Sequence, residues 1–203
     1  NLKSSYKHEI ISHFLRIYPK QQLMWIIETQ YIPTHNAIAM GYTYDKTTGQ
    51  RIFRPDNVNG NWQGKLALGG SGPFNKKHTL SFKAMGGVDY EQSVDLIDLA
   101  GSMVSNRNVV HSLDYIGQLQ LNCKLGKSSI GLKSNGSWTH VSGSREDFVS
   151  FNAADFNYGL TAQLQLPWQM RLGTDLTIYS HRGYVDKAMN NDDLVWNARL
   201  SHS

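Results

Sequence analysis

The sequence predicts an all-β fold in which about nine long strands follow one another as an antiparallel, up-and-down meander. Apolar and polar residues alternate along most segments, and the three-to-four spacing of an amphipathic helix is absent from them. Short and long connections also alternate between these segments. The predicted strands are 4–17, 22–32, 60–71, 78–87, 111–125, 128–141, 153–166, 170–181 and 193–203.

The clearest alternation runs through 153–166 and 170–181. Side chains of successive strand residues point to opposite faces, so a period of two gives one apolar and one polar face. The apolar set is even-numbered: Phe156, Tyr158, Leu160, Ala162, Leu164, Leu166, Met170, Leu172, Leu176 and Ile178. The polar set includes Gln163, Gln165, Arg171 and Asp175, and the last strand adds Asn197 and Arg199 opposite Leu194, Trp196, Ala198 and Leu200.

The parity of these two strands also predicts their turn. Directly paired residues share a face, so two even-numbered apolar sets require an odd-length loop. The simplest is Pro167-Trp168-Gln169, with Leu166 opposite Met170. Each strand then runs about twelve residues, more than the usual five or six and enough to cross a bilayer with tilt.

The strands 111–125 and 128–141 carry their apolar residues on opposite parities. This switch requires a turn of even length, either Lys127-Ser128 or Gly126 through Ser129. Cys123, the single cysteine, lies on the parity of the neighbouring leucines and is interpreted as a small apolar filler.

Connection lengths predict that the two ends of the sheet differ. The short ones are Tyr18 to Gln21, Ser71 to Lys77, Gly126 to Ser129 and Pro167 to Gln169; the long ones lie near 33–59, 88–110, 142–152 and 182–192. If every connection is a hairpin, all short turns share one end, as in outer-membrane barrels. Within the long connection 88–110, Glu91 to Met103 is expected to form a turn or two of helix.

Composition does not exclude a transmembrane barrel. The 203 residues are 40% hydrophobic and 18% charged, with mean hydropathy −0.43, and a barrel spreads its apolar residues over every second position. The longest apolar run, 23–27, is far short of a spanning helix. The net charge of +4 rests on scattered Lys and Arg, so we expect no nucleic-acid partner. The start of the chain shows no signal peptide, and we expect 1–203 to be a single barrel segment of a longer polypeptide.

Aromatic positions agree with this interpretation. Tyr18 and Trp168 lie at short turns, and membrane interfaces are enriched in such residues. The other aromatics on apolar parities are Trp62, Tyr115, Trp138, Tyr158 and Trp196.

Three segments resemble a known family. They are GYTYDKTTGQRIFRP (41–55), RPDNVNGNWQGKLAL (54–68) and LPWQMRLGTDLTIYSHRGYVDKAMNNDDLVWNARLSHS (166–203). In combination they resemble the C-terminal half of the TonB-dependent-receptor-like outer-membrane β-barrels of Bacteroidetes-type bacteria. The resemblance is strongest over 41–70 and 153–203, and it rests on strands, turns and loop ends, so no substrate-binding residue transfers with it.

The resemblance implies a place in the outer membrane and a role in nutrient uptake. The implied partners are outer-membrane lipid, a plug domain, the remaining strands of the parent barrel, a surface lipoprotein and a nutrient ligand. A plug domain and a terminal closing strand are not found in the segment 1–203. We therefore expect this segment to supply barrel wall and extracellular loops.

The sequence predicts no enzyme, metal site or cofactor. The eight histidines show no close-spaced ligand motif. His181, Asp186 and Asp193 could gather at one rim of a barrel, but almost any barrel offers as much. Asp192-Asp193 and Glu146-Asp147 are expected to be solvated loop charges, and the glycine clusters at 69–72 and 86–87 to be turns or sheet bends.

One alternative from another class of protein stays open. The same alternation would suit a soluble β-sandwich or small β-barrel that binds a sugar or a protein, with the apolar parity as its dry core.

Overall fold

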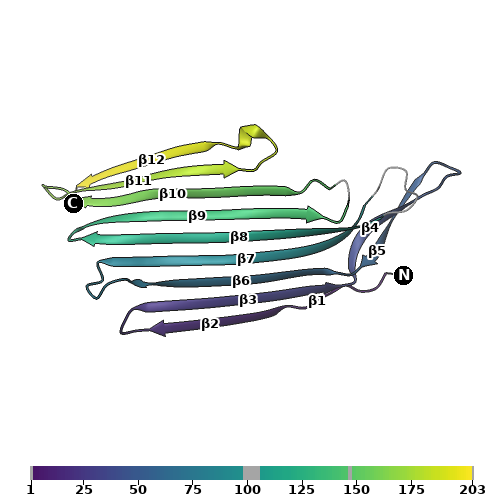
Figure 1. Cartoon of the computed structure of the whole chain (residues 1–203), viewed down its shortest axis with the longest axis horizontal. Coiled ribbons are helices and arrows are strands. Elements are labelled where there is room, and N and C mark those ends of the chain that lie inside the picture. Colours follow the sequence, from purple (N-terminus) through teal and green to yellow (C-terminus); the bar gives the residue numbers. More distant parts are fainter. Residues whose placement is uncertain (1, 98–105, 146–147, 203) are drawn as a thin grey trace.

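The chain is all-β and antiparallel in the computed structural model, which describes residues 2–97, 106–145 and 148–202. A ten-stranded sheet has the order β1-β3-β6-β7-β8-β9-β10-β11-β12, with β2 also beside β3 (Figure 1). A two-stranded sheet, β4-β5, extends from one end of it. The strands are β1 (Tyr6–Lys7), β2 (Ile10–Tyr18), β3 (Leu23–His35), β4 (Ala37–Tyr44), β5 (Arg51–Val58), β6 (Asn61–Pro73), β7 (Leu80–Ile97), β8 (Asn106–Leu125), β9 (Ser128–Gly143), β10 (Phe151–Gln165), β11 (Met170–Arg182) and β12 (Asp192–His202).

The large sheet is open. No pairing joins β2 to β12 among the described residues, and these two strands form its edges. They run in the same direction, as their arrowheads show in Figure 1. The sheet from β2 through β3 and β6 to β12 contains nine strands, each antiparallel to the next. The first and last of an odd number of such strands run in the same direction.

All nine predicted strands are present. The β10-β11 register confirms the odd-length turn, because Leu164 pairs with Leu172 and the Leu166 N–H donates to the Met170 carbonyl at 2.9 Å. The β8-β9 turn has the expected even length but lies elsewhere, since Leu125 pairs with Ser128 and leaves Gly126 and Lys127 as the turn. Gly126 has φ +64°, and glycine at the first central position is what a type II′ turn requires.

The predicted loop 33–59 was wrong over β4 and β5. The period-two pattern of this hairpin is weakened by Gly41 and two alanines, and Pro55 argues against a strand. Here Pro55 pairs with Met40 in a sheet of only two strands. Both are therefore edge strands, where a proline without a backbone N–H is tolerated. Ala39 and Val58 pack with Val94 in a small hydrophobic cluster that fixes the hairpin against β7 and β8.

Two further predictions of local structure need correction. The expected loop 88–110 is shorter, because β7 continues to Ile97 and β8 begins at Asn106. The helix expected over Glu91 to Met103 is wrong for 91–97, which is strand; the remainder lies outside the described residues. The glycine clusters at 69–72 and 86–87 lie within β6 and β7, so they are not turns.

The two ends of the sheet differ as the connection lengths predict. The turns β2-β3, β6-β7, β8-β9 and β10-β11 all lie at one end, on the left in Figure 1, which we call the turn end. The β4-β5 hairpin, the β11-β12 connection, the last residues of β7 and β9 and the first residues of β8 and β10 lie at the other, which we call the loop end.

Candidate functional site

The candidate site is the pair of faces of the large sheet, which differ sharply in chemistry. Registers place the apolar parities of β6 to β12 on one side, here called the outer face. No second layer of the described residues covers it: Leu160 is 51% exposed and Trp196 69%. The residues that share this exposed face include Ile27, Leu68, Leu119, Leu125, Ile130, Leu132, Tyr158, Leu160, Leu176, Leu194, Trp196 and Leu200.

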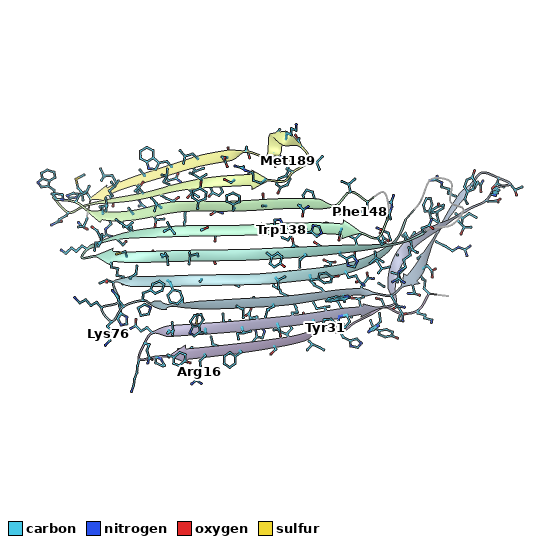
Figure 2. The ribbon with its side chains drawn as sticks, in the orientation of Figure 1. Arg16, Tyr31, Lys76, Trp138, Phe148 and Met189 are labelled. Atoms are coloured by element: carbon cyan, nitrogen blue, oxygen red, sulfur yellow. The ribbon has the colours of Figure 1, made fainter. Side chains whose placement is uncertain are left out.

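A belt of aromatic rings crosses the outer face near the loop end. The Trp62 ring lies 5.8 Å from Tyr31 and 4.7 Å from Tyr90, so the contacts join β3, β6 and β7. The belt continues on β8 and β9, where Tyr115 and Trp138 are 5.5 Å apart. Figure 2 labels two of its members, Tyr31 and Trp138, on different strands of the sheet.

A second belt lies near the turn end. Phe82 contacts Trp25 at 6.2 Å and Phe74 at 4.7 Å. Phe82 and Tyr90 both lie on β7, eight positions apart, which at about 3.3 Å per residue separates the belts by roughly 26 Å along the strand. Only aliphatic and small residues lie between them on the outer face of β7. At the strand tilt of about 40° found in transmembrane barrels, this length corresponds to a height of about 20 Å, somewhat less than their apolar band of about 25 Å.

Polar groups on the outer face of β11 and β12 are satisfied within the sheet. The Trp196 indole N–H donates to the Thr174 hydroxyl at 2.8 Å, and that hydroxyl donates to the Asn197 carbonyl at 3.0 Å. These contacts leave the outer face of the two strands apolar in effect.

The opposite side, the inner face, carries hydrogen-bonded polar chains. The Lys133 ammonium lies 2.5 Å from Asp175, which also accepts the Thr177 hydroxyl at 2.9 Å. Asn135 donates to Asn157 at 3.0 Å, so these polar contacts cross three strands, β9 to β11. Asp114 accepts from Ser112 and Thr139, which extends the pattern to β8.

Asp155 is the centre of the most connected polar cluster. Its two carboxylate oxygens lie 2.6 Å from His181 Nδ1 and 2.7 Å from the Tyr184 hydroxyl. The hydrogen bond to Asp155 raises the pKa of Tyr184 above 10.0, because ionisation would place two negative charges together. Asn190 accepts the Tyr184 N–H, and these contacts hold the β11-β12 loop onto β10.

The structure does not bring together His181, Asp186 and Asp193, the three residues that the sequence analysis considered for one rim of a barrel. His181 contacts Asp155, whereas Asp186 caps the 3-10 helix η1 (Lys187–Met189) through the Ala188 N–H, and Asp193 accepts from Asn191. Sequence reasoning missed Asp155 as the partner, although the predicted register already places Asp155 opposite His181. Asp192 binds Arg182 and Ser180 and so is not merely solvated. Glu146 and Asp147 lie outside the described residues.

The inner face is not polar throughout. Its alternation fails on β2 and β3, where Leu15 pairs with Ile26 and Ile17 with Met24, all on this side. Beyond them a shallow cavity of about 490 Å³ spans β6 to β11. Its lining is mostly apolar and includes Ala67, Met85 and Ile116, beside the polar side chains of Asp89, Asp155 and His181.

The β4-β5 hairpin ends in a well-formed turn at the loop end. Asp45 accepts the Thr47 N–H at 2.8 Å and the Thr48 hydroxyl at 2.9 Å. These hydrogen bonds hold the pKa of Asp45 below 3.8, because they stabilise the carboxylate. Tyr42 is buried, whereas Phe53, its neighbour across the hairpin, is exposed.

Within the described residues, no three His, Cys, Asp or Glu side chains gather as a metal site requires. Cys123 is a free, half-buried thiol on the outer face. None of the described helical segments has the length and apolar character to cross a membrane. Comparison with protein-family models, with curated proteins and with solved structures finds no match to the chain.

Proposed function

We propose that the chain forms wall and extracellular loops of an outer-membrane β-barrel of the TonB-dependent-receptor type and takes part in nutrient uptake across the outer membrane. The observation that carries the proposal is the bare outer face between two aromatic belts roughly 26 Å apart along β7. Large apolar patches exposed to water are rare in soluble monomers, whereas acyl chains are a suitable solvent for them.

The inner face has the properties of a barrel lumen. Its Lys133–Asp175 pair and amide contacts would be costly in hydrocarbon but are favourable where water or a second protein body is present. In the proposed barrel, the apolar inner surface of β2 and β3 lies against a plug domain, and the loop end faces a surface lipoprotein and the nutrient ligand.

The open edges fit a role as part of a larger wall. A membrane leaves no strand edge unpaired, so β2 and β12 need partners. Because these edges run in the same direction, fully antiparallel closure requires an odd number of further strands between them. Strands from the parent polypeptide would supply them, and for the isolated chain a second copy would do so, because its path of nine strands is also an odd number.

Insertion into lipid tests the proposal. We expect the urea-dissolved chain to refold into phosphatidylcholine vesicles, float with them after an alkaline carbonate wash, and gain β circular dichroism. Protease added outside should cut the β4-β5 hairpin or the other connections of the loop end and leave the strands intact. A folded, monodisperse chain that stays in the aqueous fraction would contradict the proposal and favour the soluble sugar- or protein-binding module.

A further inference from the structure

The two ends of the sheet differ strongly in charge. The turn end is formed by residues 15–26, 70–83, 121–132, 162–173 and 199–202. These segments hold nine of the twenty Lys and Arg residues but none of the sixteen Asp and Glu residues. The acidic residues that the structure describes therefore lie towards the middle of the sheet or at the loop end, where basic residues accompany them.

The cations of the turn end are exposed and lack acidic partners. Of the ion pairs among the described residues, none involves them, whereas Lys133 and Arg182 elsewhere pair with Asp175 and Asp192. Arg16 lies 5.2 Å from the Tyr18 ring centroid in a cation–π contact. The other exposed members are Lys20, Lys76, Lys77, Lys83, Lys124, Lys127, Arg171 and Arg199.

Two of the basic turns lie side by side. The Lys124 N–H donates to the Thr79 carbonyl at 2.7 Å, which joins the β6-β7 turn to the end of β8. Lys76 and Lys77 are in that turn, and Lys127 is in the adjoining β8-β9 turn. Four ammonium groups are thus gathered on neighbouring turns, and Figure 2 shows Lys76 at this end of the sheet.

The lysines lie just beyond the turn-side aromatic belt. Phe74 is two residues before Lys76 in the same turn, and its ring contacts Phe82 at 4.7 Å. Aromatic rings favour the membrane–water interface, and flexible lysines extend from it towards the headgroups. If the outer face contacts acyl chains, these ammonium groups lie at the level of the lipid phosphates.

We propose that the turn end binds the anionic headgroups of phospholipids in the leaflet that it contacts. Charge complementarity supports the anionic headgroup as the ligand. The turn-end segments carry cations that attract phosphodiesters and hold no carboxylate that would repel them. Each lysine at headgroup level contributes about fivefold to the association of anionic lipid, and salt screens this contribution. This inference rests on the proposed membrane function.

Cys123 provides a site-specific reporter. It is the only cysteine, faces outward on β8, and pairs with Leu80 and Ile130 beside the two basic turns. The whole chain, labelled there with bimane, is inserted into phosphatidylcholine vesicles. Quenching by brominated phosphatidylglycerol and by brominated phosphatidylcholine then gives the ratio of their association constants at this position.

We expect a ratio several-fold above one that falls towards one in high salt. The variant K76Q/K77Q/K124Q/K127Q should lower it to about one. The matched control K3Q/K7Q/K46Q/K187Q removes the same charge from residues outside the turn-end segments and should leave the ratio unchanged. An equal fall in both variants would mean that only net charge matters and would overturn the inference.

The outcomes separate the inference from the function on which it rests. If the chain fails to insert into neutral phosphatidylcholine vesicles, the proposed membrane function is ruled out. Insertion with a ratio of one in the unmodified chain removes only the lipid preference and leaves an acidic protein partner as the occupant of the turn end.

Discussion

Replacing Leu160 by Arg is expected to destabilise the bilayer-inserted chain by about 2–4 kcal/mol, the cost of a cation near the midplane on the lipid face of a barrel. Leu160 is on the outer face, half exposed, near the middle of β10. Leu164→Arg should cost less, because this residue lies one position from the end of the strand. The measurement is guanidinium unfolding from vesicles, followed by tryptophan fluorescence.

Gln163→Arg is the matched control. Gln163 is adjacent to Leu164 but points to the inner face, where water and polar side chains accept a cation. We expect a cost well below that of Leu164→Arg. Equal unfolding free energies for the three variants would contradict the assignment of the faces.

Gly159→Ala is expected to destabilise the sheet by about 1–3 kcal/mol, because an added methyl has no room. A Cβ built on Gly159 overlaps the Leu176 carbonyl oxygen and lies 3.0 Å from Thr177 Cα, both backbone atoms of β11. Backbone cannot rotate away as a side chain can, so β10 and β11 would have to separate. The expected result is a lower guanidinium midpoint.

Gly117→Ala is the control for this substitution. A Cβ at Gly117, on the outer face of β8, meets no atom within 4 Å. Because glycine weakens a strand, the alanine variant should be neutral or more stable by up to about 1 kcal/mol. Similar losses at both positions would mean that strand propensity, rather than the close approach of β10 and β11, decides the effect.

The alternation of side chains predicted the main sheet because it depends on local geometry alone. Leu164 and Leu172 share a face in any register in which the numbers of two paired residues add up to an even number. Pro167 limits where the turn can lie. The β8-β9 turn shows the limit of this argument, since parity fixes an even length but not which two residues form the turn. The positive φ of Gly126 decides the position, and several registers share the same parity.

The features that sequence reasoning missed depend on contacts between distant residues. Ala39, Val58 and Val94 form the cluster that fixes the β4-β5 hairpin, although Ala39 and Val94 come from different sheets. The apolar inner positions of β2 and β3 break the alternation that was used to separate the faces. Asp155, by contrast, could have been found, because the predicted register already paired it with His181.

The most direct test is to scan β10 with nitroxide labels in a Cys123→Ser background of the vesicle-inserted chain. Labels at Tyr158, Leu160 and Leu164 should collide with oxygen dissolved in lipid, and those at Asn157 and Gln163 with a water-soluble nickel chelate. Protection of the even-numbered positions from both reagents, as beneath a second protein layer, would contradict the account.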